Sequence, residues 1–222
     1  MTAIVGIHLN GVSWLGGDSL GSSDMSRIVV SQPKVFHSPD TSKIIFGCTH
    51  SFRGIDILKY TSLIDEVDLM KDIFDHQFLV QKFVPKLQQA FSENGFLTAT
   101  DNGQFIGSNF LIGTPHSIYE VQSDFSIIEA NHAGRYNSVG SGSYSCMGFL
   151  AGFDFLLGLE DVDLNIDPQE ILLAALHSAE VNTPSVGGPF HIVNTQNVDT
   201  IIYDRRFVFN GNDESEVENE ES

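Results

Sequence analysis

Short hydrophobic runs that alternate with polar residues dominate the chain and predict strands near both of its ends. Residues 3–9 are rich in β-forming side chains, Asn10-Gly11 has the composition of a hairpin turn, and residues 12–17 continue as a second strand. Further runs with strand character follow at 27–36, 43–46, 105–112, 117–122, 125–130, 190–193 and 200–203. The chain therefore begins with a predicted hairpin, and further predicted strands lie in its middle part and near its C-terminal end.

Helical spacing replaces this alternation in two regions, the first of which begins near Ser51. Hydrophobic side chains then recur every four residues within residues 75–94, at Leu79, Phe83, Leu87 and Phe91. Pro85 lies inside this run and predicts a kink or a break near Val84, because proline has no backbone N–H to donate.

The second helical region contains two segments. Residues 144–157 follow a Gly-Ser-rich turn at 140–143 and are apolar on most sides, so we expect a buried helix. Asp167 in the N-cap position, Pro168 in the first turn and Glu170 three residues after the cap predict the start of another helix.

The order of the elements is strands, two helices, strands, two helices, strands. Helices in sequential pairs disfavour a doubly wound parallel sheet, in which a helix follows each strand. The pattern favours an α+β fold with two mostly antiparallel sheets and helix layers on their outer faces.

The composition is that of a globular chain, with 222 residues of which 41% are hydrophobic. We expect one domain over residues 1–208 and an acidic, disordered tail over 209–222. The formal net charge is −18; without the six acids of the last ten residues, 23 acidic residues face 11 basic ones, a balance of −12. Such a surface argues against binding nucleic acid or an anionic membrane.

The sequence offers little for metals, cofactors or export. The eight histidines form no zinc-binding spacing, no phosphate loop is present, and we expect neither a metal nor a cofactor. Two cysteines are too few for a disulfide framework, and the first residues do not resemble a signal peptide. We therefore expect a cytoplasmic protein, or one in the host cytoplasm if a phage encodes it.

Thr2 is the first residue with a possible catalytic role. Removal of the initiator methionine before this small residue would place a hydroxyl and a free α-amine on one residue. The reference pKa of an α-amine is about 7.7–8.0, so it can act as a general base for the hydroxyl.

Two further charged residues follow at equal spacing. Asp18 comes sixteen residues after Thr2, at the end of the second predicted strand, and Lys34 comes sixteen residues later. A lysine in apolar surroundings needs a partner, and Asp18 could supply it. Its ammonium would also lower the pKa of both the hydroxyl and the amine of Thr2.

Together these residues resemble the proteasome β-subunit family, which includes the bacterial peptidase HslV (ClpQ), among the N-terminal-nucleophile hydrolases. The resemblance rests on Thr2, on Gly17-Asp18-Ser19, on Lys34, and on the Gly-Ser-Gly turn at 140–142. Residues 187–192 also resemble the strand that follows the last helix of that family.

The resemblance implies roles for individual residues. Thr2 matches the nucleophile and its amine the base, Asp18 and Lys34 match the charged pair that tunes the site, and Ser141 matches the serine near the amine. Backbone N–H groups at Cys48 and Thr49 would hold the oxyanion, although Thr49 replaces a family glycine. The family's Asp-x-x-Ser-Gly stretch reads here without its aspartate, and Ser185 is its approximate match for orienting the amine.

The resemblance implies a four-layer αββα sandwich and a threonine-type endopeptidase subunit that acts on peptides or unfolded proteins. Such subunits form hexameric or heptameric rings, single or stacked in pairs, and a separate ATPase could deliver substrates. Two alternatives stay open: a catalytically inactive ring subunit or scaffold, and an amidase with the same nucleophile. Cys48 and His50, at strand positions i and i+2, could form a nucleophile pair, but a buried structural cysteine is the favoured interpretation.

Overall fold

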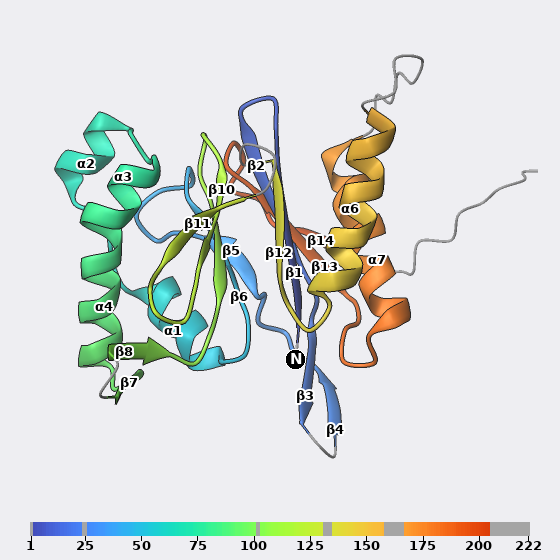
Figure 1. The fold of residues 1–222 in the computed structure, drawn as a ribbon, viewed down its shortest axis with the longest axis horizontal. Helices are drawn as coiled ribbons and strands as arrows, with labels where there is room; N and C mark the ends of the chain where they lie inside the picture. Colours follow the sequence, from blue (N-terminus) through green and yellow to red (C-terminus); the bar gives the residue numbers. More distant parts are fainter. Residues whose placement is uncertain (1, 24–25, 101–102, 131–134, 158–166, 205–222) are drawn as a thin grey trace, which may run out of the picture.

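Two five-stranded sheets lie at the centre of the fold in the computed structural model, which describes residues 2–23, 26–100, 103–130, 135–157 and 167–204 (Figure 1). The first sheet has the order β12-β1-β2-β13-β14 and the second the order β11-β10-β9-β6-β5, and neighbouring strands are antiparallel throughout. The first sheet consists of β1 (Ala3–Leu9), β2 (Val12–Gly17), β12 (Tyr136–Gly140), β13 (Phe190–Asn194) and β14 (Ile201–Tyr203). The second consists of β5 (Val35–His37), β6 (Ile45–Cys48), β9 (Phe110–Gly113), β10 (Ile118–Val121) and β11 (Ile127–Glu129).

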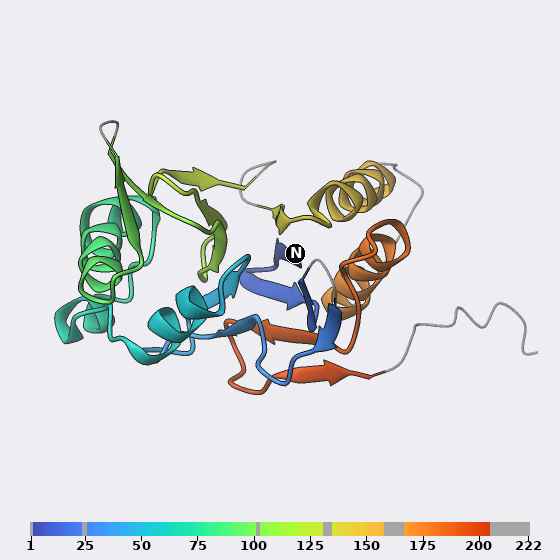
Figure 2. The same cartoon turned by 90° about the horizontal axis from the view of Figure 1, so that it is seen from below.

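Helices cover the outer face of each sheet (Figures 1 and 2). Those on the second sheet are α1 (Phe52–Tyr60), α2 (Glu66–Lys71), α3 (His76–Phe78), the π-helical turn η1 (Leu79–Phe83) and α4 (Val84–Glu93). Those on the first sheet are α6 (Ser143–Leu157) and α7 (Pro168–Asn182). Two small hairpins complete the described fold: β3 (Leu20–Ser23) with β4 (Ser26–Val29), and β7 (Leu97–Thr100) with β8 (Gly103–Ile106).

Strand β1 is buried on both of its faces, which explains its continuous run of apolar residues. Ala3 and Val5 face the α6–α7 side, whereas Ile4 belongs to the cluster between the sheets. Successive side chains of a strand point to opposite faces, so one strand contributes to two cores.

The two sheets approach each other closely at β6. A Cβ atom on Gly47 would lie 2.4 Å from Cγ2 of Ile4, so only glycine fits between β6 and β1. This contact holds the end of β6 near the start of β1, where Thr2 lies.

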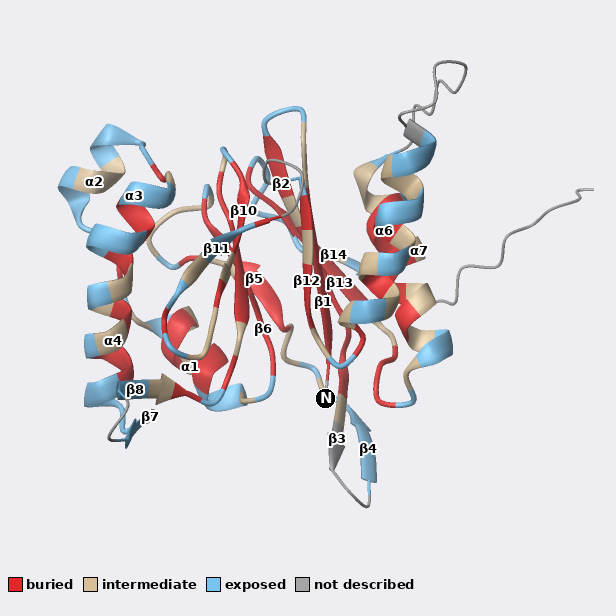
Figure 3. Cartoon of the chain, viewed as in Figure 1, coloured by how far each residue is buried: buried red, intermediate tan, exposed pale blue. Residues whose placement is uncertain are grey.

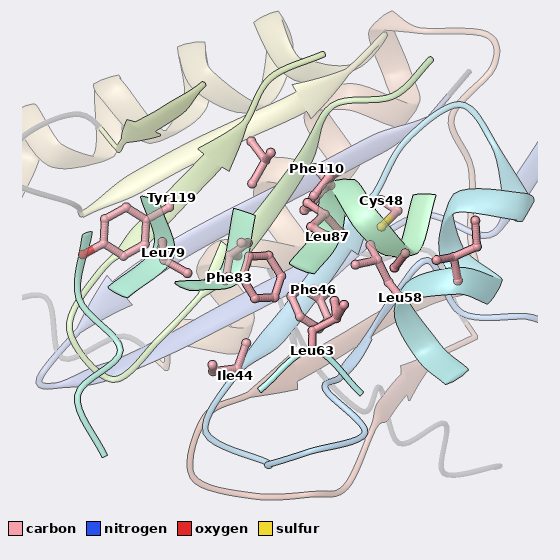
Figure 4. Packing of buried hydrophobic residues seen from close by; sticks show 14 of the residues in the cluster. Ile44, Phe46, Cys48, Leu58, Leu63, Leu79, Phe83, Leu87, Phe110 and Tyr119 are labelled. Atoms are coloured by element: carbon pink, nitrogen blue, oxygen red, sulfur yellow. The ribbon is translucent and has the colours of Figure 1, made fainter. Parts of the chain in front are cut away.

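Aromatic residues form much of the core between the second sheet and its helices (Figure 4). The ring centroids of Phe46 on β6 and Phe83 on η1 are 5.8 Å apart in a stacked arrangement. Leu79 and Leu87 from the same helical run are fully buried beside them. The four-residue spacing in the sequence therefore corresponds to the face that the helix buries.

Near Val84, where the sequence predicts a kink or a break, the chain stays helical and changes from the π-helical turn η1, which ends at Phe83, to the α-helix α4. Helix α4 begins at Val84 with Pro85 in its first turn. Proline is well tolerated there because the first N–H groups of a helix have no partner within it.

Several element predictions need correction. The predicted strand at 105–112 is divided between β8, in a separate hairpin, and β9, in the second sheet. The stretch 27–36 is likewise divided between β4 and β5. The sequence pattern also missed helix α2, whose described residues are not buried and so have no hydrophobic periodicity.

Helix α6 is not buried as predicted. Cys146 and Leu150 pack inward, but Tyr144, Phe155 and Leu156 are exposed, and most of the helix is exposed or intermediate in Figure 3. Only one side of α6 contacts the first sheet and α7, so its apolar outer side has no partner within the described chain.

The predicted helix start at Asp167 is confirmed, because its side chain accepts a hydrogen bond from the backbone N–H of Gln169. The predicted tail over 209–222 lies outside the described residues. Among the helices that the structure describes, none is long and apolar enough to cross a membrane.

Candidate active site

Thr2 lies directly before β1, where neighbouring segments hold its backbone. The carbonyl of Thr2 accepts hydrogen bonds from the N–H of Gly142 at 3.2 Å and from Ser141 Oγ at 3.2 Å. Gly140 has a φ of +98°, and a Cβ atom there would lie 2.3 Å from the Thr2 carbonyl oxygen. The Gly-Ser-Gly turn thus fits closely around Thr2, for which Gly140 must lack a side chain.

The carboxylate of Asp18 forms hydrogen bonds both to the hydroxyl of Thr2 and to backbone groups beside β1 and β3. Asp18 follows β2 and is fully buried. Its Oδ1 accepts hydrogen bonds from Thr2 Oγ1 at 3.0 Å and from the N–H of Ala3 at 3.1 Å, and its Oδ2 accepts one from the N–H of Leu20 at 3.1 Å.

Lys34 lies directly before β5 and is 4% exposed. Its Nζ donates to Asp18 Oδ1 at 2.8 Å, to the carbonyl of Leu20 at 2.8 Å, and to Thr2 Oγ1. All three protons of the ammonium therefore have acceptors, as a buried cation requires. The structure brings together the hydroxyl, the carboxylate and the ammonium that the sequence predicted.

The charge state of Lys34 reflects two opposing effects. Burial lowers the pKa of the Lys34 ammonium, while attraction and hydrogen bonding to Asp18 raise it again, and the lowering is the larger effect. A cation so close to Thr2 Oγ1 favours the ionised hydroxyl and so would lower its pKa.

Ser141 contacts the nitrogen of Thr2, and Ser185 contacts Ser141. In the chain that begins at Met1 this nitrogen is an amide, and its N–H donates to Ser141 Oγ at 3.1 Å. Ser185 Oγ lies 3.3 Å from Ser141 Oγ, so the predicted amine-orienting residue contacts the nitrogen only through Ser141.

The predicted oxyanion donors at Cys48 and Thr49 need correction. The N–H of Cys48 donates to the carbonyl of Lys34 at 3.0 Å, and that of Thr49 donates to the carbonyl of Asn109 at 3.3 Å. Both groups are engaged in strand pairing or its continuation, so neither is free to bind an oxyanion.

His50 was considered from the sequence only as a partner of Cys48, and its backbone N–H was not among the predicted donors. It has a φ of +67°, it lines the cavities beside Thr2, and no hydrogen bond of its backbone N–H is found within the described chain. His50 lies two residues after the end of β6, separated from it by Thr49. Histidine tolerates a positive φ better than most residues, but nothing in the local sequence indicates it.

The alternative Cys48–His50 pair is not supported by the contacts. Burial raises the pKa of the Cys48 thiol far above its usual range, so it stays protonated. Nδ1 of His50 lies 2.9 Å from Thr49 Oγ1, which is its hydrogen-bond partner.

Two cavities adjoin Thr2. The larger, of about 420 Å³, is lined by Thr2, Thr49, His50, Asn109, Glu120, Ser138, Val139, Gly140, Ser141, Ser143 and Tyr144. The smaller, of about 50 Å³, is lined by Thr2, Gly21, Lys34, Cys48, His50, Ser51, Phe52 and Ile55. Thr2 and His50 belong to both linings. Across the described ranges, no group of histidine, cysteine and carboxylate side chains is arranged to hold a metal ion.

Comparison of the structure with solved structures finds similar folds in several proteins. BPH from Thiobacillus denitrificans, solved in complex with epoxomicin, aligns with a TM-score of 0.64 at 16% identity, over 87% of this chain and 97% of that one. HslV from Trypanosoma brucei aligns with a TM-score of 0.60 at 14% identity, over 87% and 98%. Anbu, an ancestral β-subunit from Yersinia bercovieri, aligns with a TM-score of 0.62 at 10% identity, over 91% and 87%.

No protein-family model matches the sequence, and no curated protein matches it either. At 10–16% identity the structural matches establish the fold: a mixed α/β arrangement with antiparallel sheets, like that of HslV and Anbu.

Proposed function

We propose that the protein is a threonine-type endopeptidase subunit of the N-terminal-nucleophile class, with a four-layer αββα sandwich and Thr2 as its nucleophile. The observation that carries the proposal is the set of contacts around Thr2: Oγ1 touches the buried Lys34–Asp18 pair, and the nitrogen of the same residue touches Ser141.

Removal of Met1 turns the nitrogen of Thr2 into an α-amine, which supplies the base. The amine takes the hydroxyl proton, directly or through a water, while Oγ1 attacks the carbonyl carbon of the substrate. The Lys34 ammonium stabilises the negative charge that develops on Oγ1. Ser141 and, through it, Ser185 hold the amine in place.

The tetrahedral intermediate carries a negative oxygen that needs a donor. The N–H of His50 is the candidate, because those of Cys48 and Thr49 already donate to carbonyls. Collapse of the intermediate breaks the C–N bond, and the ammonium of Thr2 gives its proton to the leaving amine. A water, activated by the same amine, then hydrolyses the ester on Oγ1 and restores the hydroxyl.

Substitution of Thr2 tests this mechanism. We expect the protein without Met1 to hydrolyse unfolded casein and peptides, Thr2→Ala to lose this activity, and Thr2→Ser to retain part of it, because serine keeps both the hydroxyl and the amine. Activity that survives in Thr2→Ala would contradict the proposal.

A second function, a catalytically inactive ring subunit, is favoured by one observation. The stretch before β13 lacks the aspartate expected from the resemblance, and among the described residues Ser185 has only Ser141 as a side-chain hydrogen-bond partner. Retention of Met1 in the purified protein, measured by intact mass, would favour this function because the amine would be blocked.

The proposal includes self-assembly. We infer a ring of six or seven copies, single or doubled, that encloses Thr2 and acts in the cytoplasm on unfolded chains supplied by a separate ATPase. The similarity to HslV supports a ring-forming subunit. A monomer in light scattering would favour the amidase alternative, since an isolated subunit has no enclosed chamber.

A further inference from the structure

A single carboxylate lies in the wall of the larger cavity beside Thr2. Glu120 is on β10, and it lines this cavity of about 420 Å³ together with Thr2, Asn109 and Ser141. The predicted mechanism does not use Glu120, so its charge calls for another explanation.

Two amide side chains fix the position of this carboxylate. Oε1 of Glu120 accepts a hydrogen bond from Asn109 Nδ2 at 3.1 Å, and Oε2 accepts one from Asn137 Nδ2 at 3.1 Å. Asn109 precedes β9 of the second sheet, whereas Asn137 lies on β12 of the first. The carboxylate is therefore held from both sheets and has little freedom to turn away from the cavity.

The charge of Glu120 is not neutralised by these contacts. Both donors are neutral amides, each oxygen keeps a further acceptor position, and Glu120 has no ion pair with the described residues. The lining of the cavity contains neither lysine nor arginine. Asp154, by contrast, pairs with Arg135 at the surface. An oriented and unneutralised carboxylate in a half-enclosed cavity attracts a cation.

We propose that Glu120 is a specificity-determining residue that binds a lysine or arginine side chain of the substrate next to the cleaved bond. This inference rests on the proposed peptidase function, since Thr2 lines the same cavity and a carbonyl at Oγ1 would place a neighbouring substrate side chain inside it. The volume suits a long side chain, and the carboxylate supplies the fixed polar group that such sites use for orientation. A charge-assisted hydrogen bond from guanidinium or ammonium would complete the acceptor positions.

The first measurement is peptide binding to Thr2→Ala, which needs no catalysis. Octapeptides carry a single arginine at successive positions, and the control at each position is citrulline, which has nearly the same shape without the charge. We expect one position to favour arginine about tenfold in Kd. The net charge of the protein would attract arginine at every position alike, so a uniform preference would overturn the proposal.

The second measurement compares two variants that each remove one negative charge. Glu120→Gln should abolish the preference for arginine, whereas Glu129→Gln, on the exposed neighbouring strand β11 and outside the cavity, should preserve it. Equal arginine preference in Glu120→Gln and in the parent would overturn the proposal. If circular dichroism shows that Glu120→Gln does not fold, Glu120→Asp takes its place, and it should retain a preference for arginine with reduced magnitude.

Cleavage by the protein with an intact Thr2 separates this inference from the function it rests on. Cleaved peptides, mapped by mass spectrometry, should have arginine adjoining the cut, with kcat/KM about tenfold above the citrulline peptide. Cleavage without that preference would refute the role of Glu120 alone. Position-specific binding without any cleavage would refute the peptidase function and leave the cation site in place.

Discussion

Asp18 connects the beginning of the chain to the charged pair of the site. Its two oxygens accept from the hydroxyl of Thr2, from two backbone N–H groups and from Lys34. This carboxylate thus has both a structural and an electrostatic role, and the two can be separated by substitution.

Loss of Asp18 should cost more stability than loss of Lys34. Asp18→Ala leaves a buried ammonium without its carboxylate, which costs about 3–5 kcal/mol. Lys34→Met removes the charge and keeps an apolar chain of similar length, while Asp18 retains its other three donors. Urea unfolding measures both free energies; a larger loss for Lys34→Met would contradict this account.

The thiols should be unreactive in the folded protein. Cys48 and Cys146 are buried, and burial raises the pKa of Cys146 to about 12 and that of Cys48 further. Raised pKa values leave almost no thiolate at pH 8, so alkylation by iodoacetamide should need unfolding in urea. Rapid native alkylation of Cys48 would restore the cysteine alternative for the nucleophile.

At the residue scale, the sequence predicted which side chains meet where each of them lies next to a recognisable strand. Thr2, Asp18 and Lys34 each lie beside an element whose strand pattern is readable, and the structure brings their side chains together. The roles proposed for His50 and Glu120 were missed for a physical reason. The role proposed for His50 depends on a backbone angle, and that proposed for Glu120 depends on two asparagines from different sheets.

At the scale of elements, strand alternation and helical spacing predicted which faces are buried more accurately than they predicted where each element begins and ends. Strand β1 and the Leu79–Phe83–Leu87 face are buried as the pattern indicates. The helix at 143–157 was misjudged because an apolar surface looks the same in sequence whether its own chain or another chain covers it.

The outer side of α6 should form a contact between copies. Phe155 is 70% exposed on it, and an exposed apolar side without a partner in its own chain is typical of interaction surfaces. Phe155→Glu should reduce the mass of the assembly in light scattering, whereas Met70→Glu on α2, which is 84% exposed, serves as the control. An unchanged assembly in Phe155→Glu would contradict a role for this side.

At the scale of the whole molecule, the negative charge bears on assembly. Copies that each carry −18 repel one another, and about −12 of this remains without the last ten residues. We predict that salt strengthens the ring, because salt screens exposed charges over about 10 Å at 0.1 M. Sedimentation between 50 mM and 500 mM NaCl measures this; a ring population that falls as salt rises would show complementary charge pairs between subunits instead.

The arrangement of the sheets was predictable from the sequential pairing of helices, whereas the angle and closeness of the sheets were not. Gly47 illustrates the difference. Its sequence context indicates only a strand, yet the close contact with Ile4 that requires glycine arises from residues 43 positions apart.

The most direct test of the account is reaction with a peptide epoxyketone, followed by intact mass and peptide mapping. The probe reacts with a hydroxyl and a free amine on the same residue, so it reports the nucleophile and the loss of Met1 together. We predict one adduct per chain, located at Thr2 and absent from Thr2→Ala. A protein that begins with Met1 and forms no adduct, under conditions that label a control proteasome, would contradict the central claim.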